Sequence, residues 1–145
     1  MVDLIQINDP DDPRVAPFRD VRERDLARRD GLFIAEGKVV VAAMLAARRF
    51  LPRSMLVLDR RVEGLADVLR DAPQDLPVYV ATQPVIDAVA GFHLHRGILA
   101  LAERQSAPPL AALLQRLPRR CTVPVLVGIS NHDNMGSIFR NAAAF

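Results

Sequence analysis

Short apolar runs that alternate with helical segments most strongly constrain how this chain can fold. The runs are Leu32–Ala35, Ser54–Leu58, Pro77–Ala81, Ile98–Ala102 and Val123–Ile129. Segments with helical periodicity lie between or beside them: Lys38–Phe50, Val62–Asp71, Pro84–Ala90 and Ala107–Leu117. Strands that are apolar without alternation are typical of a sheet covered on both faces, and intervening helices supply the crossover connections. The pattern predicts the α/β class.

Length and composition exclude several other classes of protein. The chain has 145 residues, half of them apolar and a quarter charged, which is typical of one globular domain and not of a disordered tail. No apolar run approaches the roughly 18 residues that a bilayer span needs, and the first positions carry acids instead of a basic signal region. We therefore expect a soluble, cytoplasmic protein. A single cysteine, Cys121, excludes a disulfide scaffold, and His93 and His95 lack the spacing of a metal site, so no metal is expected.

The order of these segments predicts one main domain and the start of another. Residues 1–17 are interpreted as an N-terminal arm, because the prolines and aspartates at 9–13 favour turns. Residues 18–106, opening with a polar helix at Phe18–Arg29, form the main domain. Residues 107–120 are predicted to be a linker helix and turn bracketed by proline-containing stretches. Residues 121–145 are interpreted as the truncated start of a second domain, because the final helix, predicted over Met135–Phe145, has no C-cap.

Positive charge is concentrated in one part of the chain. Positions 14–61 carry twelve basic residues against six acidic ones, and eighteen of the nineteen basic residues in the chain are arginine. Arginine presents a planar fork to phosphates and stacks on bases, which favours a nucleic-acid partner. A genome that prefers arginine codons, with the side chains spread over solvated helix faces, explains the same composition. Composition alone leaves both interpretations open.

The last segment carries the most specific pattern in the chain. Residues 125–142 are interpreted as a strand, a polar loop and a helix whose buried face recurs at helical spacing. Gly136 and Arg140 lie four positions apart and therefore share a flank of this helix, where Gly136 leaves room for a ligand backbone. Asn134 is placed to cap the helix. A plain structural interpretation remains open, with Asn134 as a cap, Gly136 as a packing residue and Arg140 as a solvated side chain.

Four stretches together resemble the TrmH/SpoU family of RNA ribose 2′-O-methyltransferases, in the SPOUT superfamily. Val125–Phe145 resembles the first motif of the family, with an Asn-x-Gly at Asn134 to Gly136 and then a helical Arg140. Residues 31–37, Gly-Leu-Phe-Ile-Ala-Glu-Gly, resemble its N-terminal Phe-x-x-Glu-Gly signature. Residues 95–100 resemble the segment before its linker, and the arm with the Arg-rich first helix resembles its entry. The resemblance implies an α/β substrate-binding domain similar to a ribosomal RNA-binding protein at 18–106, followed by the first strand and helix of a SPOUT-type domain.

The resemblance also implies an activity, a cofactor and roles for individual residues. The family transfers a methyl group from S-adenosylmethionine to a ribose 2′-hydroxyl of rRNA or tRNA, with Arg140 and Asn134 matching residues at its reaction centre. Its later cofactor motifs have no counterpart here, so no cofactor-binding residue is expected and the isolated chain is expected to be inactive. The complete protein is expected to be a homodimer through the domain that is absent. The alternative is a non-catalytic RNA-binding module that docks structured RNA.

Four residues are predicted to contact RNA: Arg28, Arg29, Arg96 and Gly136. Arg28 and Arg29 fall in the Arg-rich helix at positions that are usually basic in the family, although a solvated helix face explains them equally well. Arg96 lies in the segment before the linker. Glu36 matches the glutamate of the family and is interpreted first as a carboxylate placed before a helix N-terminus.

Overall fold

A computed structural model describes residues 2–19 and 31–144, and their contacts divide the chain into two units, Met1–Ser106 and Ala107–Phe145. The strands of the first unit are β1 (Leu4–Ile7), β2 (Leu32–Glu36), β3 (Phe50–Leu58), β4 (Val78–Ala81) and β5 (Ile98–Arg104). Its α-helices are α1 (Lys38–Ala46), α2 (Ala66–Asp71) and α3 (Gln83–Ala90). Short 3-10 helices lie at η1 (Pro13–Phe18), η3 (Asp59–Arg61) and η4 (Glu63–Leu65). None of the helices in the described ranges is long and apolar enough to cross a bilayer.

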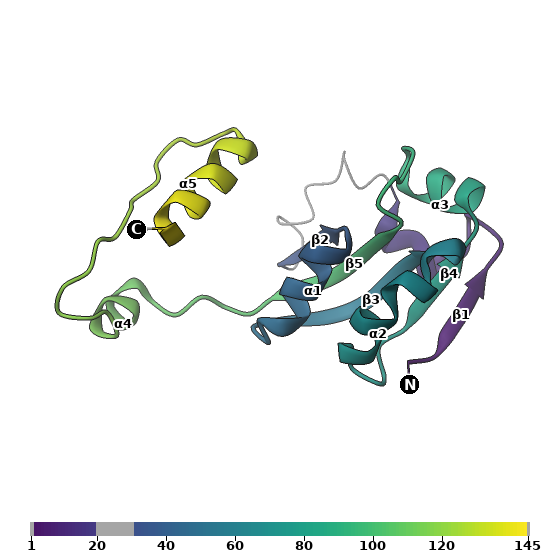
Figure 1. The fold of residues 1–145 in the computed structure, drawn as a ribbon, viewed down its shortest axis with the longest axis horizontal. Coiled ribbons are helices and arrows are strands. Elements are labelled where there is room, and N and C mark those ends of the chain that lie inside the picture. The colour runs from purple at the N-terminus through teal and green to yellow at the C-terminus, as the bar shows by residue number, and fades with distance from the viewer. Residues whose placement is uncertain (1, 20–30, 145) are drawn as a thin grey trace. The chain divides into compact units, whose positions relative to one another are not determined.

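The five strands form one mixed sheet in the order β1-β4-β3-β5-β2 (Figure 1). Strands β1, β4 and β3 run parallel, while β5 is antiparallel to both of its neighbours. Parallel neighbours require crossover connections, and the helices between β3 and β4 supply one of them. The predicted α/β class is confirmed.

Apolar side chains cover both faces of the sheet. Along β3, Met55 and Val57 join a cluster under α1 and α2, while Leu56 and Leu58 join a second cluster under α3 and η1. Helices α1 and α2 lie side by side over the first face (Figure 1). All four of these β3 side chains are fully buried, although they point alternately to opposite faces of the sheet. This is why β3 lacks an alternation of apolar and polar residues.

Several strand ends meet at one edge of the sheet. The carboxyl end of β3 is in register with that of β4, since Leu58 pairs with Ala81. Because β5 is antiparallel, its beginning lies at the same edge, with Ile98 opposite Val57. Glu36, at the end of β2, pairs with Leu99. Open α/β sheets place their ligand sites at such an edge.

The helix predicted over Lys38–Phe50 is shorter in the structure. It ends at Ala46, and the chain then turns through Arg48, which has a φ of 48°. The residues from Phe50 onward belong to β3, where Pro52 lies opposite Ala102. The register of the pairing shifts between Pro52 and Ser54, and this irregularity accommodates a residue that cannot donate to the sheet.

Two further expectations for the first unit differ from the structure. Residues 1–17 were expected as an arm, but Leu4–Ile7 pairs with β4 as an edge strand and Val15 is fully buried. The helix expected over Val62–Asp71 begins as the 3-10 turn η4, and only Ala66–Asp71 is α-helical. The predicted polar helix at Phe18–Arg29 lies almost entirely outside the described residues.

The second unit contains helices α4 (Leu110–Gln115) and α5 (His132–Ala144). The strand expected at Val123–Ile129 is wrong, because the described residues offer this segment no paired strand. Val125 and Val127 are 80% and 83% exposed. A strand depends on a partner that is remote in sequence, whereas a helix such as α5 closes its own hydrogen bonds.

Candidate nucleic-acid interface

A basic pocket of about 390 Å³ opens at the sheet edge where β2, β3 and β5 meet. Its walls are the turn from β2 into α1, the end of η3 and the loop that leads into β5. It is lined by Glu36, Gly37, Lys38, Val39, Val40, Arg61, His95 and Arg96. We refer to it as the Arg61–Arg96 pocket.

Gly37 allows Arg96 to lie directly against the backbone of the β2–α1 turn. Gly37 has a φ of 92°, which L side chains rarely adopt, and a Cβ there would lie 2.9 Å from Cδ of Arg96. The Gly37 amide donates to the carbonyl of Ile98 over 3.0 Å, which fixes the turn to the start of β5. The glycine thus provides both the turn and the surface on which the Arg96 side chain rests.

Gly97 plays the same part for Arg61. It has a φ of 68°, and a Cβ there would lie 2.7 Å from Cγ of Arg61 and 3.4 Å from Cβ of Leu58. The Gly97 carbonyl accepts from the Leu58 amide over 2.9 Å, which joins the end of β3 to this loop. At this edge of the sheet, the side chains of Arg96 and Arg61 therefore pack against two glycines.

Arg61 and Arg96 are the cations of the pocket without an ion-pair partner among the described residues, and the carboxylate of Glu36 lines the same pocket. Within the described part of the chain, neither Arg61 nor Arg96 has a carboxylate at ion-pair distance. Lys38 differs, because its Nζ lies 2.9 Å from Oδ1 of Asp67 and donates to the carbonyl of Gly64. The hydrogen bond from Lys38 lowers the pKa of Asp67. Two exposed guanidinium groups without anionic partners favour an anionic ligand with spaced charges, such as a phosphodiester backbone.

Of the residues predicted to contact RNA, the structure places Arg96 in one pocket with Arg61. Among the residues that it describes, none of the other three lines this pocket. Arg28 and Arg29 lie outside the described residues. Gly136 belongs to the second unit, where a Cβ would lie 3.7 Å from Nη1 of Arg140, an ordinary contact. Glu36 ends β2 and lines the Arg61–Arg96 pocket, but it does not cap α1, because Gly37 is the N-cap and the Glu36 side chain makes no capping hydrogen bond among the described residues.

The predicted reaction-centre residues share helix α5 in the second unit. Arg140 is exposed and its Nη2 donates to Oγ of Ser137 over 3.0 Å. Asn134 does not cap the helix as expected, because it lies within the first turn. The cap is Asn131, whose Oδ1 accepts from the amides of Asp133 and Asn134 over 2.8 and 3.2 Å. Sequence reasoning placed the cap three residues late because both asparagines suit that role.

The part of the second unit that the structure describes does not fit S-adenosylmethionine. None of its residues is buried, and Asn134 and Arg140 both face solvent. A cofactor of that size needs a concave site that removes most of its surface from water. The residues present therefore do not form a cofactor site.

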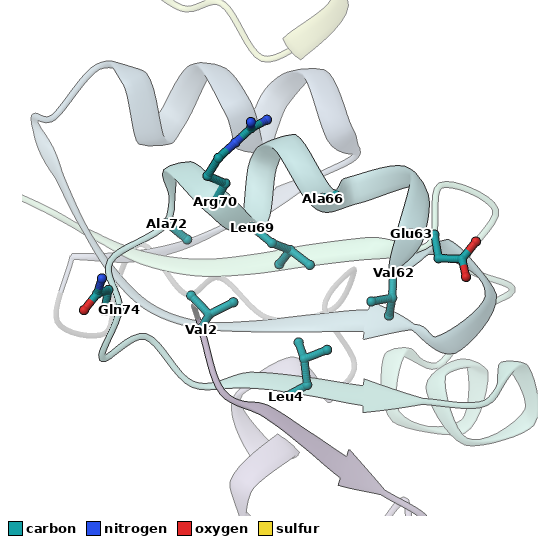
Figure 2. Close-up of a pocket in the computed structure, with 9 residues that line it drawn as sticks. All are labelled: Val2, Leu4, Val62, Glu63, Ala66, Leu69, Arg70, Ala72 and Gln74. Atoms are coloured by element: carbon teal, nitrogen blue, oxygen red, sulfur yellow. The ribbon is translucent and has the colours of Figure 1, made fainter.

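A second cavity, of about 580 Å³, lies between β1 and α2 and has a different character. In Figure 2 the apolar side chains of Val2, Leu4 and Leu69 point toward one another, whereas the charged ends of Glu63 and Arg70 point away. Its lining offers apolar contact and no converging charge. The two cavities suit different ligands, and only the Arg61–Arg96 pocket suits an anion.

Sequence reasoning missed Arg61, Gly37 and Gly97 as members of one site. Arg61 lies three residues beyond the end of β3, in the η3 turn, and nothing local distinguishes it from Arg60. Each glycine stands beside a residue that had been singled out, Glu36 and Arg96. Their meeting depends on the antiparallel placement of β5, which the sequence pattern did not specify.

Comparison with known proteins supports the relationship suggested by the motifs. No protein-family model matches the chain. Two proteins named uncharacterized tRNA/rRNA methyltransferase, from Mycobacterium bovis and Mycobacterium tuberculosis, are each 45% identical over 98% of this chain. The chain spans about half the length of these relatives, 49% of each.

Solved structures share the fold at low sequence identity. A crystal structure of an RNA 2′-O ribose methyltransferase matches 98% of this chain and 52% of its own, with a TM-score of 0.61 and 18% identity. An rRNA methyltransferase from Sinorhizobium meliloti matches 72% of this chain and 39% of its own, with a TM-score of 0.52 and 14% identity. The resemblance to the TrmH/SpoU type of RNA methyltransferase is therefore confirmed, and the chain is a relative of these proteins that corresponds to about half of their length.

Proposed function

We propose that the complete protein is an RNA ribose 2′-O-methyltransferase that acts on tRNA or rRNA in the cytoplasm, with S-adenosylmethionine as methyl donor. The observation that carries this proposal is the 45% identity over 98% of the chain to proteins named tRNA/rRNA methyltransferase. The proposal assigns RNA binding to residues 18–106, a linker to 107–120 and the start of the methyltransferase domain to 121–145. It includes a homodimer formed through the part of the relatives' length that this chain does not contain.

The Arg61–Arg96 pocket supports RNA as the partner. Its two guanidinium groups lack carboxylate partners among the described residues. Both arginine side chains pack against glycines, whose lack of a Cβ leaves room for them next to the backbone. Such groups bind phosphates in a sequence-independent way and orient the RNA. In this proposal the pocket holds the RNA backbone, and Arg28 and Arg29 add further phosphate contacts.

Arg140 and Asn134 are proposed to act at the ribose. A ribose hydroxyl is unreactive near neutral pH, so a nearby cation that stabilises the developing charge on its oxygen lowers the barrier. Arg140 can do so as a planar donor, because a guanidinium group presents several N–H groups in one fixed plane. Since the described residues form no cofactor site, we assign no further step to this chain.

Methyl transfer to defined RNAs by the complete protein tests this proposal. We expect radiolabelled methyl groups to enter an unmodified tRNA transcript or an rRNA stem-loop transcript and to protect one phosphodiester bond from alkali. Arg140→Ala is expected to lower the single-turnover rate by roughly 10²-fold, the scale for one preorganised donor, and Arg140→Lys to restore little of it. Arg116→Ala, an exposed arginine of the same unit, is the matched control. RNA binding without any methyl incorporation would instead favour a docking module.

A further inference from the structure

Two polar side chains of α3 fasten the loop that carries Arg96. The Leu94 amide donates to Oδ1 of Asp87 over 2.9 Å. Nε2 of Gln83 donates to the same oxygen over 2.7 Å and to the Leu94 carbonyl over 3.4 Å. Leu94 is fully buried and Arg96 follows two positions later. The start of the arginine-bearing loop is therefore held at both its amide and its carbonyl.

Gln83 also contacts the residue that precedes Arg61. Nη2 of Arg60 donates to Oε1 of Gln83 over 2.6 Å, and the next residue is Arg61. On the loop side, Nδ1 of His93 lies 2.6 Å from Oδ2 of Asp87. Gln83 and Asp87 are four positions apart on α3 and share one flank of it. Helix α3 thus contacts Leu94 and the side chain of Arg60, which lie two and one positions before Arg96 and Arg61.

A carboxylate is electrostatically unfavourable beside a site for phosphate. Asp87 retains 27% exposure, and partial burial by itself would raise its pKa. Hydrogen bonds from the Leu94 amide, His93 and Gln83 outweigh that effect and lower the pKa, so the group is anionic near neutral pH. If Asp87 favours anion binding in the Arg61–Arg96 pocket, it does so through the hydrogen bonds that it accepts and not through its charge.

We propose that Asp87 and Gln83 are positioning residues of the Arg61–Arg96 pocket: Asp87 sets the placement of Arg96 through the Leu94 amide, and Gln83 sets that of Arg61 through Arg60. This inference rests on the proposed binding of RNA by the pocket. It assigns to α3 a role in RNA affinity, although Asp87 and Gln83 themselves do not line the pocket.

An electrostatic role and a positioning role of Asp87 predict opposite changes in RNA affinity when its carboxylate is removed. Removal of an anion beside a phosphate site strengthens RNA binding if only electrostatics acts. If Asp87 positions the loop, Asp87→Ala weakens binding of a tRNA transcript by about five- to tenfold, the scale of one typical intramolecular hydrogen bond. Asp87→Asn keeps an oxygen for the Leu94 amide and is expected to restore most of the affinity. Fluorescence anisotropy with the full chain at low salt measures these differences.

Asp67→Ala provides a matched control at the same pocket. Asp67 also offsets a positive charge of the pocket, through its ion pair with Lys38. Among the described residues, however, its side chain accepts no hydrogen bond from the loops that carry Arg61 and Arg96. Its loss is expected to tighten RNA binding, in contrast to the loss of Asp87. Thermal unfolding of both variants separates a local effect from loss of the fold. If Asp87→Ala unfolds, Gln83→Ala replaces it: weaker binding supports the positioning role, and unchanged binding overturns it.

A double-mutant cycle with Arg96→Ala distinguishes this inference from the proposed function. If Asp87 acts through Arg96, its substitution loses most of its effect in the Arg96→Ala background. Additive effects, or tighter binding by Asp87→Ala, would overturn the positioning role while leaving the RNA site intact. Arg96→Ala with unchanged RNA affinity would reject the RNA site itself and the positioning role with it.

Discussion

Gly97 shows how a single residue without a side chain shapes the pocket. A Cβ at this position would lie 2.7 Å from Cγ of Arg61, near the base of that side chain, and the φ of 68° is costly for other residues. We predict that Gly97→Ala lowers the free energy of unfolding by about 1–3 kcal/mol, the usual cost of such backbone strain. Urea titration of the full chain measures it.

Gly64→Ala is the control for this substitution. A Cβ at Gly64 would meet nothing within 4 Å, and its φ lies outside the left-handed range. The stability of this variant should be unchanged or slightly higher, since alanine reduces the freedom of the unfolded chain. Equal stability losses at the two glycines would mean that crowding around Arg61 has no effect.

The residues of the site could be predicted from the sequence only in part. Arg96 was singled out because it lies in a recognisable stretch before Gly97, and Glu36 because it precedes a helix. Arg61 was not, because nothing local distinguishes it from Arg60. The structure separates the two: Arg60 hydrogen-bonds Gln83, whereas Arg61 packs over Gly97.

At the scale of elements, strand β3 contains both a buried and an exposed leucine, which allows a direct test of the core. Leu56 is fully buried at the centre of this strand, while Leu51 near its start is 47% exposed. We predict that Leu56→Ala lowers the free energy of unfolding by about 2–5 kcal/mol, because a cavity remains in a packed core. Leu51→Ala, the same substitution on the same strand, is expected to cost under about 1 kcal/mol, since surface changes have small effects. Similar losses at both positions in urea titrations would contradict the burial of Leu56 in the core.

The sequence predicted continuous apolar strands better than short mixed ones. Strands β4 and β5 are close to their predicted ranges because burial on both faces makes each one a continuous apolar run, and the edge strand β2 was found because its run is also apolar. The edge strand β1 was missed, since Leu4–Ile7 is short and interrupted by Gln6. Val123–Ile129 was predicted wrongly for the opposite reason, because an apolar run indicates a capacity for pairing and not the presence of a partner.

At the scale of the whole molecule, the two units should differ in local stability. The sheet of the first unit protects its amides, whereas Val123–Ile129 makes no strand pairing among the described residues. We predict that hydrogen exchange in the isolated chain is much faster at 123–129 than at 33–58, because exposed amides exchange through small local openings. Equal protection in a monomer would show that the segment docks on another part of the chain.

The central claim is that the Arg61–Arg96 pocket binds RNA phosphates, and the salt dependence of RNA binding tests it most directly. Affinity for a tRNA transcript should fall with salt, and each of Arg61→Ala and Arg96→Ala should reduce the log–log slope by about 0.7–0.9, the contribution of one phosphate contact. Arg53→Ala is the control, since Arg53 is already paired with Glu103. We expect it to leave slope and affinity unchanged. Arg61 and Arg96 variants that retain the wild-type affinity and slope would contradict the account.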